Sequence, residues 1–352
     1  MAAANVPTAR PVPLRALRSF LGTYGLILVL LAMPVAFGIA DLREEGDLSR
    51  LGNNLLDGLS NGSIWALVAI GYTLVYGIVE LINFAHGEVF MIGSFVSAGF
   101  FGTIGLTAAT GAAGLVVGLL LTLVLAMIAS GALNVMIERV AYRPLRNAPK
   151  LAPLITAVGF SFILQNVGLL WRGGSQQSIV DLIESQQELF SFAGISVTNG
   201  DALAVAVTVP LVLAMTAFIA KSRLGKAMRA TAQDPDAARL MGINVDTTIS
   251  ATFLIGGMLA GAAGLIYALY QTTVWFFQGF TAGLIAFTAA VMGGIGNLRG
   301  AVLGGLIIGF IQQLSDNRIG TQWTPAIVFA YLVLIMVFKP SGLLGEQTRE
   351  AG

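Results

Sequence analysis

The chain has 352 residues, of which 56% are hydrophobic and only 11% are charged. Soluble domains carry about 25% charged residues, so this composition excludes an ordinary soluble protein. The net charge is only +1 at pH 7, and the absence of cysteine excludes disulfides, thiolate metal sites and a cysteine nucleophile.

Apolar runs long enough to cross a bilayer recur along the whole sequence. A membrane-spanning helix needs roughly 18 or more apolar residues, and LTLVLAMIASGALNVMI is too continuously apolar for a strand of an outer-membrane barrel. The sequence therefore predicts an all-α, polytopic transmembrane helical bundle of about 8–10 spans, some of them short or broken. Hydropathy places candidate spans near residues 20–40, 59–82, 88–108, 111–137, 151–171, 202–220, 247–272, 280–296, 301–315 and 323–339.

The 43 glycines suggest close helix packing. Small residues let helix backbones approach each other in lipid, where they often recur four residues apart. We expect helix packing, with no other role, to explain most of these glycines. Four pairs have the required spacing: Gly114/Gly118, Gly257/Gly261, Gly300/Gly304 and Gly305/Gly309.

Residues 1–50 are interpreted as an N-terminal extension with an extra transmembrane helix. A basic segment, an apolar stretch and FGIA before Asp41 also resemble a cleavable signal peptide. The apolar core is longer than such signals usually have, so we favour a retained helix. Both interpretations leave Asp41 on the outer side.

The distribution of lysine and arginine predicts the orientation, because cytoplasmic loops carry the excess of positive charge. With these spans, 15 of the 19 basic residues fall on one side. We take that side as cytoplasmic, together with both termini. The four exceptions are Arg43, Arg50, Arg172 and Arg318.

The outer loops are acidic. In SIVDLIESQQELFSF, the acids Asp181, Glu184 and Glu188 fall on one helical face. This pattern predicts a short amphipathic helix on the outer surface. It either rests at the membrane interface or docks an extracytoplasmic partner. The apolar residues that can face elsewhere are Ile179, Leu182, Ile183 and Phe190.

The loop 221–246 carries a second short helix, predicted to lie on the inner side. Asp234 is a helix-capping residue, Pro235 suits the first helical position, and Gly242 supplies a stop. A helix of about two turns is too short to be stable alone in water, so it needs a partner surface or the underside of its own protein. Its small and apolar contacts are Ala237, Ala238, Leu240 and Met241.

No catalytic or nucleotide-binding motif accompanies this loop. LGKA resembles the end of a phosphate-binding loop, but Ala220 and Ala227 replace its first glycine and its hydroxyl residue. GGIGNLRG fails the dinucleotide fingerprint at Arg299, and GLSNGS lacks the serine-centred turn of a hydrolase. One histidine without cysteine makes a zinc site improbable. We therefore expect no enzyme, no metal and no cofactor.

Four segments carry a family resemblance, and they lie in the same order as in that family. They are NGSIWALVAIGYTLVYGIVELINFAHGEVFMIGSFVS, IERVAYRPLR, GKAMRATAQDPDAARLMGINVD and AFTAAVMGGIGNLRGAVLGGLIIG. Together they resemble the permease subunit of branched-chain amino acid ABC importers, the LivH type. The likeness runs from about residue 54 to 346, so we assign 51–346 to a permease domain and 347–352 to a tail. Similar permeases import urea and short-chain amides, which leaves the substrate open.

The resemblance implies a heteromeric importer in the cytoplasmic (inner) membrane of a bacterium. Its partners would be a second permease, two cytoplasmic ATPases and an extracytoplasmic solute-binding protein. No nucleic acid is implied. In such permeases a cytoplasmic loop provides a helix that couples to the ATPase, and this maps onto residues 227–242. The implied coupling residues are Arg229, Asp234, Pro235, Ala237, Ala238, Leu240, Met241 and Gly242.

The stretch INFAHGEVFMIG places the only histidine, His86, beside Glu88 in an apolar region. An unpaired charge at the bilayer centre costs at least about 2.5–3.5 kcal/mol, so such groups are functional candidates. One hypothesis is that two interrupted segments line a solute route. Equally, Asn83 and His86 satisfy the backbone at a tight turn and Glu88 caps the next helix. The route candidates are Asn83, His86, Glu88, Gly293, Gly294 and Gly296.

Two rival functions use the same features. A secondary transporter or channel suits a bundle with interrupted helices, but it assigns no partner to the helix in the loop 221–246. An intramembrane enzyme would use His86 and Glu88 as acid and base. No nucleophile or metal ligand accompanies them, which makes the enzyme the weaker rival.

Overall fold

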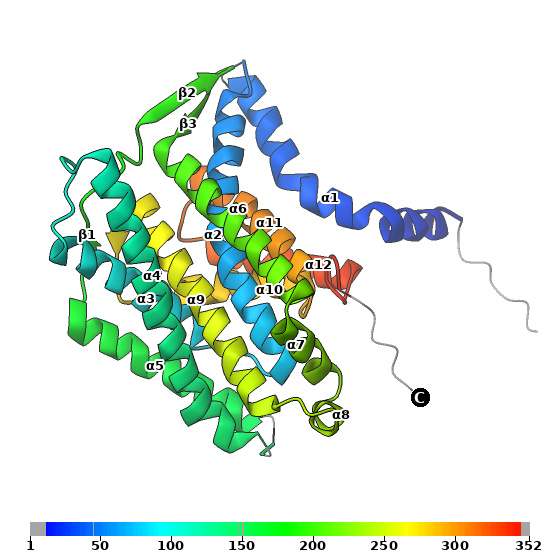
Figure 1. The fold of residues 1–352 in the computed structure, drawn as a ribbon. Coiled ribbons are helices and arrows are strands. Elements are labelled where there is room, and N and C mark those ends of the chain that lie inside the picture. Colours follow the sequence, from blue (N-terminus) through cyan, green and yellow to red (C-terminus); the bar gives the residue numbers. More distant parts are fainter. Residues whose placement is uncertain (1–11, 45, 147, 150, 346–352) are drawn as a thin grey trace, which may run out of the picture.

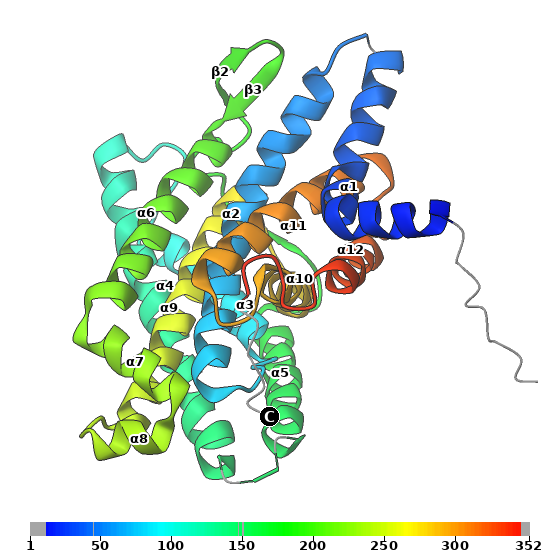
Figure 2. The same ribbon diagram turned by 90° about the vertical axis from the view of Figure 1, so that its right-hand side faces the viewer.

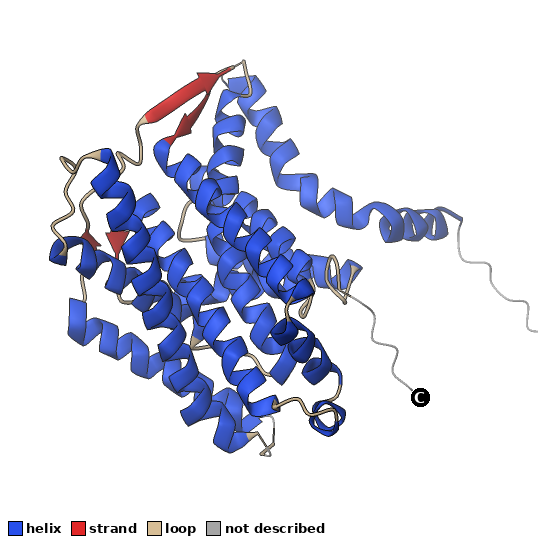
Figure 3. Cartoon of the chain, in the orientation of Figure 1, coloured by secondary structure: helices blue, strands red, loops and turns tan. Residues whose placement is uncertain are grey.

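The computed structural model describes residues 12–44, 46–146, 148–149 and 151–345. The first eleven residues of the predicted extension, Lys150 and the tail 347–352 lie outside this part. Within it, the chain forms twelve α-helices and two short antiparallel strand pairs (Figures 1 and 3). The helices are α1 (Val12–Glu44), α2 (Ser49–Val79), α3 (His86–Thr103), α4 (Ala112–Ile137), α5 (Leu151–Arg172), α6 (Asn199–Lys221), α7 (Arg223–Gln233), α8 (Pro235–Leu240), α9 (Val245–Gln271), α10 (Gln278–Gly293), α11 (Leu298–Arg318) and α12 (Thr324–Phe338). The strands are β1 (Gln177–Ser178), β2 (Glu188–Phe192), β3 (Ile195–Thr198) and β4 (Thr273–Val274).

The predicted fold class is confirmed. Each of the ten predicted spans corresponds to one helix, and the two remaining helices, α7 and α8, lie in the loop 221–246. Among the described residues, six helical segments are long and apolar enough to cross a membrane, while α10 and α12 are apolar but shorter. The six are Ser49–Val79, Ala112–Leu145, Leu151–Arg172, Asn199–Lys221, Val245–Gln271 and Leu298–Arg318.

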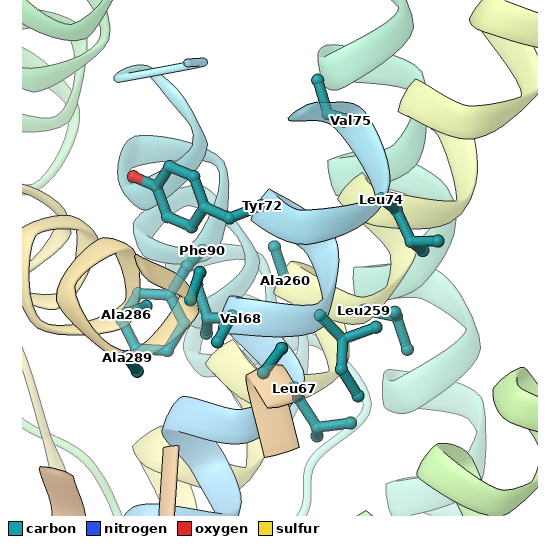
Figure 4. Close-up of a cluster of buried hydrophobic side chains, with 14 of the residues drawn as sticks. Leu67, Val68, Tyr72, Leu74, Val75, Phe90, Leu259, Ala260, Ala286 and Ala289 are labelled. Atoms are coloured by element: carbon teal, nitrogen blue, oxygen red, sulfur yellow. The ribbon is translucent and has the colours of Figure 1, made fainter. Parts of the chain in front are cut away.

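Helix α2 runs through the centre of the bundle, and every residue from 60 to 75 is buried (Figure 2). A helix that is apolar around its whole circumference must be covered on all sides by protein or lipid. Here α6, α9, α10 and α11 cover most of it. Figure 4 shows Val68 of α2 and Phe90 on the side of Ala286 and Ala289 of α10, and Leu67 on the side of Leu259 of α9.

Glycine allows α2 and α11 to touch along their backbones. A Cβ atom at Gly305 would lie only 2.6 Å from the Cα atom of Ala66, and one at Gly309 would overlap the backbone of Gly62. The predicted pairs Gly257/Gly261 and Gly300/Gly304 likewise lie against the backbones of α4 and α10. The pair Gly114/Gly118 does not, because it faces Thr110 and Leu106 of its own preceding loop.

The end of the bundle where α1 meets α2 is closed by polar contacts. The hairpin of β2 and β3 is held to α2 by Asn53, whose Oδ1 accepts from the Ser196 amide at 2.9 Å and whose Nδ2 donates to the Gly194 carbonyl at 3.1 Å. On the other flank, Arg318 of α11 forms ion pairs with Asp41 and with Glu44, the latter at 2.8 Å. These contacts join the β2–β3 hairpin to α2, and α11 to α1, at the same end of the bundle.

The amphipathic helix predicted over the acidic loop is wrong. Residues 179–187 form no helix and consist of irregular backbone with bends and one turn, and residues 188–192 form strand β2. The apolar side chains of this segment are used elsewhere, since Leu182 is buried with Ile179 and Ile183 packed around the same cluster between α3, α4 and α9. The segment that makes these contacts has an irregular backbone, so its packing against α3, α4 and α9 overrides the helical period of the sequence. The three acids therefore do not share a helical face.

We expect the ion pairs of Arg318 to stabilise the packing of α1 against α11. The Arg318→Met variant would leave the almost completely buried Asp41 without its counter-ion, which costs about 3–5 kcal/mol. Thermal unfolding of the detergent-solubilised chain measures this loss. The double variant Arg318→Met/Asp41→Leu should recover most of it, because no charge then stays buried. Equal stability of the single and double variants would contradict the role of this ion pair.

Candidate translocation pathway and coupling site

The chain breaks inside the bundle between α2 and α3, at residues 80–85. Asn83 holds this turn: its Oδ1 accepts from the Ala85 amide at 3.2 Å, and its carbonyl accepts from the His86 amide at 3.0 Å. Its Nδ2 donates to Asn134 of α4 at 3.1 Å, and Asn134 in turn donates to the Phe253 carbonyl of α9 at 2.6 Å. The geometry at Asn83 is that of the tight turn considered from the sequence.

His86 begins α3 and is fully buried. Its imidazole packs edge-on against the Tyr72 ring, with the centroids 4.8 Å apart. The position of Gly71 makes room for the ring, since a Cβ there would overlap His86 Nε2. The imidazole thus lies between α2 and α3, behind Tyr72.

Glu88 lies in the first turn of α3 and is also fully buried. Its Oε1 accepts a hydrogen bond from Ser161 Oγ of α5 at 3.2 Å. Its Oε2 lies close to Gly279 in the first turn of α10, where a Cβ atom would overlap it. The carboxylate therefore lies beside the first turns of two helices, where negative charge is favoured.

The second interrupted segment connects α10 to α11. Gly294 and Gly296 adopt left-handed backbone conformations, with φ of 108° and 89°. The Gly293 carbonyl accepts from the Leu344 amide at 2.9 Å, and a Cβ on Gly294 would overlap Gly345. Gly293 and Gly294 are thus covered by the segment 342–345, whereas Gly296 borders a cavity.

Three cavities follow one another along the side of α2 and α10. The first, of about 190 Å³, shares Tyr72 with the second, which is a constriction of about 10 Å³. The constriction shares Ile295 with the third cavity, of about 570 Å³, which Gly296 also borders. The first cavity thus lies near the α2–α3 break and the third near the α10–α11 break.

The residues that line these cavities differ from the route candidates chosen from the sequence. Of the six route candidates only Gly296 borders one of these three cavities, while Asn83, His86 and Glu88 lie behind their walls. Tyr72 and Ser161, which do line the first cavity, were missed. Hydropathy carries no signal for them, because the same apolar helices contain other hydroxyl side chains, such as Thr73 and Thr156, that it does not distinguish from these two.

The short helix predicted in the inner loop is present as α8. The Asp234 carboxylate accepts from the amides of Asp236 at 2.9 Å and Ala237 at 3.0 Å, and Pro235 is the first helical residue. Gly242 ends the turn with φ of 81°. The predicted start and stop are therefore confirmed.

The faces of α8 are unequal. Leu240 and Met241 are 89% and 82% exposed, although both are apolar. Ala238 was expected to be offered to a partner, but it is buried against its own chain. Arg229 belongs to the separate helix α7, and it donates to the carbonyls of Ile219 and Ala220 at the end of α6.

An ion-pair network holds α9, which follows α8, against the helical turns directly after α4. Arg143 donates to Asp246 of α9 at 2.9 Å, and Arg146 contacts both Asp246 and the buried Glu138. Glu138 also accepts from Ser250 of α9 at 2.7 Å. These ion pairs form a charged clamp, which fixes the start of α9 directly after the loop that carries α8.

A helical bundle with several candidate membrane spans, cavities beside its central helix and an exposed short helix at one end fits a membrane permease. A family model described as "Branched-chain amino acid transport system / permease component" matches residues 54–337. The chain belongs to this family. It is a permease component of a transport system, and the resemblance noted in the sequence is confirmed.

Individual relatives agree with the family match. The high-affinity branched-chain amino acid transport system permease protein BraD of Pseudomonas aeruginosa is 41% identical over 294 residues, covering 83% of this chain and 95% of that protein. The corresponding protein LivH of Escherichia coli K12 is 42% identical over 300 residues, covering 83% and 94%. A probable branched-chain amino acid permease protein LivH of Methanocaldococcus jannaschii is 28% identical over 300 residues, covering 80% and 89%.

Proposed function

We propose that this chain is the membrane subunit of an ATP-driven importer of branched-chain amino acids. Relatives more than 40% identical over most of the chain carry that substrate in their names. Uptake of urea or short-chain amides is the second candidate, because the sequence resemblance extends to such permeases. The proposed partners are a second permease subunit, two cytoplasmic ABC ATPases and an extracytoplasmic solute-binding protein.

The observation that carries the ATPase partnership is the exposure of Leu240 and Met241 on α8. Two large apolar side chains in water are unfavourable by about 1.5–3 kcal/mol each relative to burial. A helix of six residues has little stability of its own and gains it from a covering surface. An ATPase subunit docked here would supply that surface, and the clamp at Asp246 would pass its movement to α4 and α9.

The same end of the molecule supports the proposed orientation. Basic residues gather around α7 and α8 and at the end of α4, which favours the cytoplasmic side for that end. Both termini then lie in the cytoplasm. The end with the β2–β3 hairpin faces outward, and Asp181, Glu184 and Glu188 stay candidates for contact with a binding protein, now from a loop and a strand.

The route for the solute is proposed to follow the three cavities. A solute released at the outer end would occupy the cavity beside Tyr72, pass the constriction and leave through the wide cavity beside Gly296. The constriction has room for about one water, so this conformation is closed to an amino acid. ATP-driven movement of α8 would open it.

Purification and reconstitution test the assignment. Mild detergent extraction should bring two ATPases and a second permease along with this chain. Proteoliposomes with the whole complex, ATP and the binding protein should accumulate radiolabelled leucine, and those with this chain alone should not. Uptake by the chain alone under an ion gradient would overturn the proposal in favour of a secondary transporter. Uptake of urea in place of leucine would select the second candidate.

A further inference from the structure

The cavity beside Tyr72 combines apolar walls with a polar end. It lies between α2, α5, α10 and the loop 80–85, and its volume is about 190 Å³. Two hydroxyl side chains line it, Tyr72 at 5% exposure and Ser161 at 7%. In Figure 4 the Tyr72 hydroxyl points away from the apolar cluster of α2. The remaining wall residues are Phe84, Val158, Phe162, Phe280, Gly283 and Leu284.

A buried carboxylate stands behind one of these hydroxyls. Ser161 Oγ donates its hydrogen to Glu88 Oε1 at 3.2 Å, so the oxygen lone pairs of Ser161 are left for a donor from the cavity. Glu88 Oε2 is buried and accepts no hydrogen bond from the described residues. An ammonium group placed here would favour the ionised form of the Glu88 carboxyl group, because opposite charges attract strongly in a low-dielectric interior.

The volume and the walls restrict the rest of the ligand. A cavity of 190 Å³ is smaller than the roughly 300–1,000 Å³ of pockets for drug-sized ligands, so it suits a small solute. The rings of Phe84, Phe162 and Phe280 give an aliphatic side chain an apolar surface to cover. At the other polar position, the Tyr72 hydroxyl can donate to a carboxylate.

We propose that this cavity is a binding site within the membrane for a single amino acid in transit. Its ammonium group is held by Ser161 with Glu88 behind it, its carboxylate accepts from Tyr72, and its aliphatic side chain packs on the phenylalanine wall. This inference rests on the proposed function and deepens it. It assigns recognition of the amino acid to the permease itself, at the stage after the solute leaves its binding protein.

Direct binding of radiolabelled leucine to the purified permease–ATPase complex, without binding protein, tests the site. The wild-type complex should bind leucine, and excess leucine should compete whereas N-acetylleucine, which lacks the ammonium group, should not. Ser161→Ala should weaken binding by about tenfold or more, because one hydrogen bond to a charged group is lost. Val158→Phe should abolish binding by filling the cavity. Val167→Phe, on the same helix and outside the cavity lining, is the matched control and should bind like the wild type.

The outcomes separate this site from the proposed function. The proposed binding site is overturned if the wild type does not bind leucine, or if Ser161→Ala and Val158→Phe leave leucine binding unchanged. In either case, ATP-driven leucine uptake by the complex would still support the proposed function. If the wild-type complex does not take up leucine with ATP and the binding protein present, the proposed function is overturned. Phospholipid found by native mass spectrometry in the wild type and lost in Val158→Phe, with leucine uptake unchanged, identifies a lipid cavity and also overturns the site.

Discussion

Replacing both Leu240 and Met241 by glutamate is expected to abolish ATP-driven uptake while leaving the permease folded. Both side chains are almost fully exposed, so the change removes no packing within the chain. Burying them against an ATPase would contribute about 1.5–3 kcal/mol each. The variant should therefore weaken assembly by at least about a hundredfold, since each 1.4 kcal/mol is a factor of ten. Co-purification of the ATPase and leucine uptake in proteoliposomes measure both effects.

A swapped pair is the control for this experiment. The variant Leu240→Met/Met241→Leu keeps the apolar surface and should assemble and transport like the wild type. Gel filtration of the glutamate variant should show a monodisperse permease, because Asp234 and Pro235 still begin the helix. Normal uptake by a folded glutamate variant would show that α8 does not transmit the work of ATP hydrolysis.

Gly305→Val is expected to prevent stable folding of the chain. A Cβ at this position would lie 2.6 Å from the Cα atom of Ala66, which belongs to the backbone of the central helix α2. Backbone cannot move aside as a side chain can, so α11 would have to separate from α2. Overpacking costs about 1–3 kcal/mol where side chains can adjust, and we expect about 3 kcal/mol or more here. Yield of monodisperse protein and its thermal unfolding temperature are the measurements.

Gly159 of α5 offers a matched control within another membrane-spanning helix. A Cβ there meets no atom within 4 Å, so Gly159→Val should fold with almost unchanged stability. The comparison separates the effect of close backbone contact from any general effect of valine in a helix. Equal stability of Gly305→Val and Gly159→Val would contradict the contact between α2 and α11.

Features that depend on local chemistry were predictable from the sequence alone. The helices at the ten predicted spans follow from long apolar runs, because a backbone in lipid must satisfy its own hydrogen bonds by forming helices. Asp234, Pro235 and Gly242 were sufficient to define α8, since helix caps are formed by residues adjacent in the chain. The family resemblance was likewise evident from contiguous segments.

Only the tertiary structure decided which residues meet across the bundle. The acidic loop lost its expected helix because Leu182 and its neighbours pack between α3, α4 and α9. Ala238 is buried against its own chain, and His86 lies behind Tyr72. The helical period of the sequence does not say which way either side chain points. The cavity that unites Tyr72 and Ser161 joins helices far apart in sequence. Spans and caps are short-range consequences of composition and backbone hydrogen bonding, whereas a cavity depends on how distant helices pack, which no local pattern encodes.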